Sequence, residues 1–349
     1  MQQNKTKVNF NGIARTSIAP LYARAKISNE YSSIFNDAKA VELVERMDSD
    51  LISINKVDTN YFDFSLVARA IQFDNVVKAY IKEHPHASVV NLGTGLDTGF
   101  YRIDNGTIHW YDLDLPEVIE ARKQLIPETD RSTCIAKSFL DPSWCQDIKT
   151  ESGVFMVAGG LLRYFSETQV CQFFSLLADR LPGSEIVFEA ESKSSSIVDG
   201  NSGAYGVGWS DHEPEKRDAL QTEALRAFKN VWVRVPKDVK DRMLGALTTP
   251  TKPQSTEWED FEVWWNQLNA QEKGKAMSDF LAGHSKDLKC ECPLEDANEM
   301  TMWDNRITVV DQFPLFRDIP RDPSLSLSIR QFMDYTDEKG RIKIFHIRV

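Results

Sequence analysis

The sequence contains little cysteine: five of its 349 residues, an odd and scattered set. A chain of this size with so few cysteines is not held together by a disulfide framework. Cys290 and Cys292 are separated by one residue, but no matching Cys/His pair lies nearby in the sequence. Because a structural metal site needs about four such ligands, we expect ordinary thiols here and no bound metal.

Long apolar runs and dense positive charge are also absent. No stretch approaches the roughly 18 apolar residues of a membrane span, and no apolar signal-peptide core follows the polar segment Met1 to Lys7. We therefore expect a cytoplasmic protein without a membrane partner. The 41 Lys and Arg residues against 52 Asp and Glu give a net charge of −11. This charge would repel a phosphate backbone, so a nucleic-acid partner is not expected.

Helical periodicity is present in the first 86 residues. Apolar residues recur at helical spacing from Phe35 to Met47 and again from Phe64 to Ile81. The pair His84-Pro85 ends the second helix, because the residue before a proline is pushed out of the α region. We expect residues 1–86 to form a helical region that contributes to a cap over the site.

After residue 86, short apolar runs alternate with longer helical segments, which is the pattern of a doubly wound parallel sheet. The fold class is therefore α/β: a Rossmann-like, mostly parallel sheet with a final antiparallel strand, N-terminal helices and a helical insertion. Crossover helices are predicted at Leu115 to Leu125 and Glu167 to Leu181, and an amphipathic stretch at Leu325 to Met333. The predicted strands are Ser88 to Leu92, Thr107 to Leu113, Thr133 to Lys137, Gly153 to Ala158, Glu185 to Ala190, Arg306 to Phe313 and Arg341 to Val349.

A long segment without a sheet pattern interrupts this core. The core is predicted at 87–200, the insertion at 201–294 and the last part of the sheet at 295–349. From Tyr205 to Leu288 the insertion is polar, Trp-rich and helix-prone, and about 80 residues are too many for a plain connection. We expect it to form a mainly helical lid over the ligand site. Its tryptophans Trp258, Trp264 and Trp265 are expected to serve mainly in packing.

The stretch VVNLGTGLDTGF, residues 89–100, contains a glycine turn directly after a strand. Ligands of parallel sheets bind beyond the carboxyl ends of the strands. The third glycine of the dinucleotide fingerprint is replaced by Thr98, and Asp97 would place a negative charge near a phosphate. Asp114, 19 residues after Gly95, can accept hydrogen bonds from two ribose hydroxyls. The pattern favours a cofactor without phosphate and with a positive centre, such as S-adenosylmethionine, whereas Asp112 is expected to face solvent or to cap the next helix.

Three segments, NLGTGLDTGFYRI, YDLDLPEVIEARKQLI and AGGLLRYF, together resemble the leucine carboxyl methyltransferase family. The resemblance is strongest to the branch similar to the tetracenomycin polyketide O-methyltransferases. It covers roughly residues 15–195 and 295–349 and leaves out the segment between them. The sequence departs from the family at Gly99, where arginine is frequent, and at Gly159, where the protein-methylating branch has glutamate. The second departure favours a small-molecule acceptor over a protein C-terminus.

The resemblance implies a class I methyltransferase fold that binds S-adenosylmethionine. It implies that the turn from Gly93 to Asp97 holds the methionine end, Asp114 holds the ribose and Ser138-Phe139 flanks the adenine. It also implies that Arg69 pairs with the methionine carboxylate, for which a planar guanidinium is well suited. The predicted cofactor residues are Arg69, Gly93, Thr94, Gly95, Asp97, Asp114, Leu115, Ser138, Phe139 and Gly159. The predicted acceptor residues are Tyr22, Tyr164, Tyr205, Trp209 and His212, with His212 and Tyr164 as candidates for a catalytic role.

The predicted function is methyl transfer from S-adenosylmethionine to a carboxylate or hydroxyl of a small molecule, such as a polyketide-like secondary metabolite. The two acceptor types are both open, and so is the oligomeric state. A non-catalytic protein that binds the cofactor is one alternative. A nicotinamide-dependent oxidoreductase is another, against which the missing third glycine counts.

Overall fold

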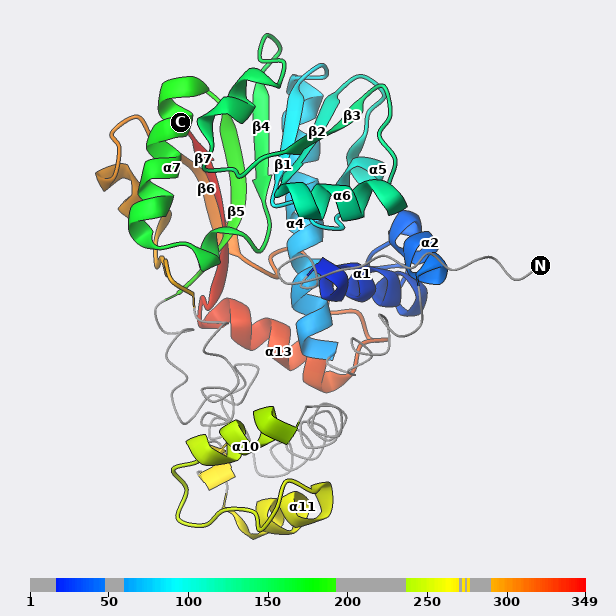
Figure 1. Ribbon diagram of the computed structural model, residues 1–349, viewed down its shortest axis with the longest axis vertical. Helices are drawn as coiled ribbons and strands as arrows, with labels where there is room; N and C mark the ends of the chain where they lie inside the picture. Colours follow the sequence, from blue (N-terminus) through cyan, green and yellow to red (C-terminus); the bar gives the residue numbers. More distant parts are fainter. Residues whose placement is uncertain (1–16, 48–59, 193–236, 270–271, 274, 277–289) are drawn as a thin grey trace, which may run out of the picture.

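A seven-stranded sheet forms the centre of the protein. The structure is a computed structural model that describes residues 17–47, 60–192, 237–269, 272–273, 275–276 and 290–349 (Figure 1). The sheet order is β3-β2-β1-β4-β5-β7-β6. Only β7 runs antiparallel to its neighbours β5 and β6, so the predicted fold class is confirmed. The strands are β1 (Ser88–Leu92), β2 (His109–Asp114), β3 (Ser132–Ala136), β4 (Val154–Ala158), β5 (Glu185–Glu191), β6 (Thr308–Pro314) and β7 (Ile342–Arg348).

Local sequence signals set where several helices begin. The carboxylate of Asp37 accepts the backbone N–H of Ala40 at the start of α2, and Pro116 occupies the first turn of α6. Ser166 and Gln169 form a capping box at the start of α7. The helices are α1 (Ile18–Glu30), α2 (Ala38–Arg46), α4 (Asn60–Glu83), α5 (Gly99–Ile103), α6 (Pro116–Leu125), α7 (Glu167–Arg180), α10 (Lys237–Ala246), α11 (Trp258–Gln267) and α13 (Leu327–Glu338). The 3-10 helices are η2 (Pro142–Gln146), η3 (Leu162–Tyr164) and η5 (Ala297–Met302).

Both faces of the sheet are covered by apolar side chains. Alternate strand residues point to opposite faces, so Val89 and Phe155 pack in one core, whereas Val90 and Met156 pack in another. The first core includes side chains of α4 and α13, and the second includes side chains of α7. Because both faces are covered, every residue of β1 and β4 is buried, and β4 is apolar throughout.

The carboxyl ends of the parallel strands face α1 and α13, and α10 and α11 lie beyond α13 on the same side of the molecule (Figure 1). The described part of the insertion contains the helices α10 and α11, and the assignment of the insertion as a lid stays a prediction. In α11, Trp258, Trp264 and Trp265 are buried around Phe261, which confirms their expected packing role. No helix in the described residues has the length and apolar character needed to span a bilayer.

Candidate functional site

The turn after β1 has a backbone that favours glycine at two positions. Gly93 and Gly95 have φ angles of +63° and +48°, in the left-handed region. A Cβ on Gly93 would lie 2.8 Å from Cδ1 of Leu161, and a Cβ on Gly95 would lie 2.7 Å from the Cβ of Ser17. At positions 93 and 95, both the backbone conformation and the available space therefore favour glycine.

Asp114, at the end of β2, lies against the same turn. Its Oδ2 accepts the backbone N–H of Gly95 at 2.8 Å, and its Oδ1 accepts that of Leu115 at 2.8 Å. Burial raises the pKa of Asp114 above its usual range. Each carboxylate oxygen has a second lone pair, so Asp114 can still accept hydrogen bonds from two adjacent hydroxyls.

The expectation for Asp112 was wrong, because this residue neither faces solvent nor caps α6. Its buried carboxylate accepts hydrogen bonds from Oγ1 of Thr94 at 2.7 Å and Nε1 of Trp110 at 2.9 Å, and pairs with Nη2 of Arg122 at 2.8 Å. Side-chain alternation places Asp112 under the turn, with its charge matched by a helix residue. The Thr94 hydroxyl is held by Asp112, its backbone N–H donates to the carbonyl oxygen of Leu113, and its carbonyl oxygen accepts the N–H of Asp97.

Arg122 of α6 stabilises the turn by hydrogen bonds to its backbone. Its Nη1 donates to the backbone oxygens of Gly95 at 3.0 Å and Asp97 at 2.8 Å, while Nη2 pairs with Asp112. Sequence reasoning missed this residue. The available signal was its spacing, because Arg122 follows Val118 by four positions and therefore lies on the apolar stripe of its helix.

Asp97 is surrounded by arginines. Its Oδ1 lies 3.5 Å from Nη1 of Arg24 and 3.6 Å from Nη2 of Arg102. Burial acts to raise the pKa of Asp97, but the nearby guanidinium groups of Arg102, Arg24 and Arg122 outweigh it and lower the pKa well below the usual range. The charge of Asp97 is therefore compensated. This differs from the sequence-based expectation that Asp97 would present an unpaired negative charge near a phosphate. Its role is to hold the turn onto α1 and α5.

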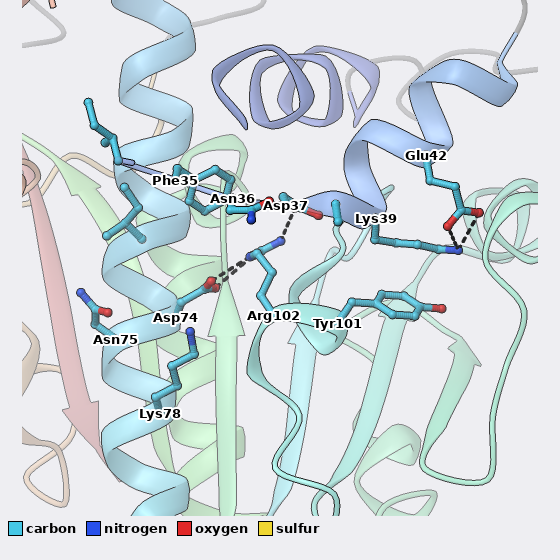
Figure 2. A pocket seen from close by; sticks show the side chains of 13 residues that line it. Phe35, Asn36, Asp37, Lys39, Glu42, Asp74, Asn75, Lys78, Tyr101 and Arg102 are labelled. Carbon is cyan, nitrogen blue, oxygen red and sulfur yellow. Dashed lines mark hydrogen bonds and ion pairs between the residues drawn. The ribbon is translucent and has the colours of Figure 1, made fainter. Parts of the chain in front are cut away.

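Arg102 connects this turn to a cavity on its far side. Its guanidinium makes two bonds to Asp74, at 2.7 and 3.0 Å, and one to Asp37 at 2.7 Å, as Figure 2 shows. The cavity has a volume of about 620 Å³, and none of the predicted site residues lines it. It is lined by Ile34, Phe35, Asn36, Asp37, Ala38, Lys39, Glu42, Ile71, Asp74, Asn75, Lys78, Tyr101 and Arg102. Since Arg102 also contacts Asp97, the cavity and the glycine turn share this side chain.

A second group of predicted residues meets beyond β4. Arg69 of α4 pairs through Nη1 with Oε1 of Glu189 on β5 at 2.9 Å. A Cβ on Gly160 would lie 2.9 Å from Nη1 of Arg69, and one on Gly159 would lie 3.6 Å from its Nε. The guanidinium of Arg69 therefore lies across both glycines. Leu161 follows them and touches Gly93, so this group adjoins the turn after β1.

Ser138 and Phe139 follow β3, but the Phe139 ring is part of the core. It packs edge-on against Phe165 and Phe173, with ring centroids 4.7 and 4.9 Å apart. Any contact of Phe139 with an adenine would come from its backbone. Ser138, in contrast, is only partly buried.

The predicted acceptor residues are spread over several segments. Tyr22 is half-buried on α1. Tyr164 in η3 is 47% exposed, with the Arg163 guanidinium 5.8 Å from its ring centroid. Tyr205, Trp209 and His212 lie outside the described residues, so their assignment stays a prediction.

Cys290 and Cys292 are buried thiols. Burial, with a smaller effect from Cys290, raises the pKa of Cys292 to about 12. Burial thus favours the neutral thiol form of Cys292. No group of three or more metal-ligating side chains converges in the described part of the chain.

The sequence profile of the leucine carboxyl methyltransferase family matches residues 17–178. The tetracenomycin polyketide synthesis O-methyltransferase TcmP of Streptomyces glaucescens is 31% identical over 185 residues, which are 52% of this chain and 67% of TcmP. The chain belongs to the leucine carboxyl methyltransferase family. Within the family, it is similar to the branch that contains TcmP.

A second relative and a solved structure extend this comparison. The S-adenosyl-L-methionine-dependent methyltransferase dpfgK of Gibberella zeae is 24% identical over 206 residues, covering 54% of this chain and 69% of dpfgK. The plantazolicin methyltransferase BamL, solved with S-adenosylhomocysteine, is 10% identical with a TM-score of 0.38 and coverage of 97% and 98%.

The protein is an S-adenosylmethionine-dependent methyltransferase, and its described residues fit that cofactor. The two glycines with positive φ let the chain turn sharply after β1, and Asp114 keeps acceptor capacity for a ribose. The family departure at Gly99 also has a physical reason. A Cβ there would lie 2.8 Å from Oδ2 of Asp97 and 3.1 Å from the Trp110 ring, so these side chains take the space of a larger residue.

Proposed function

We propose that this methyltransferase transfers its methyl group to an oxygen of a small molecule, a carboxylate or a hydroxyl of a polyketide-like metabolite. The observation that carries the proposal is the relation to TcmP, a polyketide O-methyltransferase by name. The glycine at position 159 supports it, because the protein-methylating branch of the family has a glutamate at this position. The pair Gly159-Gly160 is followed by the exposed Tyr164, which suits an open pocket for a flat ligand.

Different residues around the carboxyl ends of the strands would bind different parts of the cofactor. Asp114 would accept hydrogen bonds from the ribose hydroxyls, and Arg69 would hold the methionine carboxylate. Ser138 and the backbone of Phe139 would border the adenine. When bound, S-adenosylmethionine supplies an electrophilic methyl group on a sulfonium. The contribution of the protein is then to align the acceptor oxygen and to exclude water.

The acceptor type decides whether a base is needed. A carboxylate is already ionised at pH 7, whereas a phenol with a pKa near ~10 benefits from a base. His212 and Tyr164 are the proposed candidates for that base. The insertion is the proposed lid, and the location of α10 and α11 beyond the carboxyl ends of the strands supports this.

Transfer of radiolabelled methyl from S-adenosylmethionine tests the proposal with three acceptors: a hydroxynaphthoic acid, its methyl ester, and a peptide ending in leucine. Mild base releases methanol from a new methyl ester but leaves a methyl ether intact. Volatile label from the free acid alone would identify a carboxylate acceptor. Stable label on both aromatic compounds would identify a hydroxyl acceptor.

Two other results would contradict the proposal. Label on the peptide alone would assign the protein to the protein-methylating branch. Binding of S-adenosylhomocysteine without transfer to any acceptor in a wider panel would favour the non-catalytic alternative.

Asp114→Ala is expected to weaken the binding of S-adenosylhomocysteine. The loss of charge-assisted hydrogen bonds to two hydroxyls corresponds to roughly 1.5–3 kcal/mol in binding free energy, or about ten- to a hundredfold in Kd. Titration calorimetry measures this change, with Asp141→Ala as a control, because Asp141 is an exposed cap of η2. Equal affinity of wild type and Asp114→Ala would remove Asp114 from the site.

A further inference from the structure

Glu189 is a largely buried carboxylate near the carboxyl end of β5, and it was not among the predicted site residues. Its Oε1 lies 2.9 Å from Nη1 of Arg69 and accepts the backbone N–H of Gly160 at 2.5 Å. About 10% of its side chain is exposed. In the sheet, Phe188 is paired with Ala158, so Glu189 lies beside Gly159. A strand neighbour thus brings a carboxylate to a turn that has no side chain of its own.

The second carboxylate oxygen of Glu189 has unused hydrogen-bonding capacity. Its Oε2 is buried and has no hydrogen-bond partner among the described residues. A buried polar atom without a partner costs about 1–3 kcal/mol, and native structures contain few of them. The atom lies next to Arg69, which is the proposed partner of the methionine carboxylate. A donor that arrives with the same ligand would satisfy it.

The amino acid end of the cofactor has such a donor. It is a zwitterion, with an ammonium group next to its carboxylate. The pair of Arg69 and Glu189 has the complementary charges in adjacent positions. A guanidinium has five N–H donors, so Arg69 can hold Glu189 and a second carboxylate at once.

We propose that Glu189 binds the α-ammonium group of S-adenosylmethionine through Oε2. This inference rests on the proposed function insofar as Arg69 binds the carboxylate of the same ligand. Oε1 keeps its bonds to Arg69 and Gly160 and thereby orients the free oxygen. Glu191, two residues further on β5, is already paired with Arg163 and does not take this role.

The test compares two ligands in two variants. Glu189→Gln keeps an amide oxygen that can accept from Arg69 and Gly160, but it replaces Oε2 with an N–H₂ group that cannot accept from an ammonium. The ligands are S-adenosylhomocysteine and its deamino analogue, in which hydrogen replaces the ammonium group. Titration calorimetry measures both dissociation constants at pH 7, and thermal unfolding checks that the variant is folded.

We expect Glu189→Gln to raise the Kd of S-adenosylhomocysteine at least tenfold, about 1.4 kcal/mol, and to change that of the deamino analogue less than twofold. Glu191→Gln is the matched control and should leave both constants within twofold. Equal weakening of both ligands would overturn the proposal, because Glu189 would then act only by positioning Arg69. Unchanged binding of both ligands would also overturn it. If wild type binds neither ligand, the cofactor site itself is misassigned, a result distinct from both.

Discussion

Gly95→Val is expected to abolish the binding of S-adenosylhomocysteine while leaving the protein folded. Gly95 has a φ of +48°, and a Cβ there would lie 2.7 Å from the Cβ of Ser17. A branched side chain must therefore displace α1 or the turn itself. A shift of the turn moves the Gly95 N–H, which Asp114 accepts at 2.8 Å. We expect a loss of more than a hundredfold, roughly 2.7 kcal/mol or more, in titration calorimetry.

Gly106→Val is the control that separates the effect of backbone strain from the effect of the steric clash at Gly95. Gly106 also has a positive φ, +88°, but a Cβ there would meet no atom within 4 Å. This control should lower stability by roughly 1–2 kcal/mol for the left-handed conformation and leave ligand affinity unchanged. Circular dichroism reports the fold of both variants. Affinity of Gly95→Val within tenfold of wild type would mean that the turn does not approach the ligand.

Arg122→Met is expected to cause the largest loss of stability, about 3–5 kcal/mol. The change leaves the buried Asp112 carboxylate without its ion pair and removes the donor to the backbone oxygens of Gly95 and Asp97. Both side chains of the pair are nearly inaccessible to water. Urea denaturation followed by fluorescence measures the free energy of unfolding.

Two further variants show whether the cause is the unpaired charge. Lys123→Met, the next residue, removes a lysine from a half-exposed pair with Glu128 and should cost less than about 1 kcal/mol. Arg122→Met combined with Asp112→Asn removes both charges and should be more stable than the sum of the single changes. A loss below 1 kcal/mol for Arg122→Met would show that the pair is not important for stability.

The central strands β1, β2, β4 and β5 were predictable from the sequence because they are largely buried on both faces. β1 has the predicted bounds, and the other strands differ from prediction by a few residues at most. Helix α1 was missed because it has no single apolar face: Leu21 and Ile27 are buried, but so are Arg24 and Ser28. Helix α5 has only five residues, Gly99–Ile103, too few for a periodic pattern.

The site was predictable where neighbouring residues in the sequence form it. The glycine turn and Asp114 meet as expected, because parallel strands end at one edge of the sheet. Glu189 and Arg122 were not predictable in the same way. Their partners, Arg69 and Asp112, come from other elements, and only the packing of a helix on a strand brings each pair together.

The position of β7 has a consequence for the order of folding. β7 lies between β5 and β6, so the strand that contains Glu189 gains its second neighbour only after residues 342–348 have left the ribosome. Glu185 and Arg348, which this pairing joins, are 163 residues apart in the sequence. Contacts of such long range form slowly, because the entropy of the connecting chain is lost before the pairing stabilises the sheet. The sheet around Glu189 can thus be completed only after β7 has been synthesised.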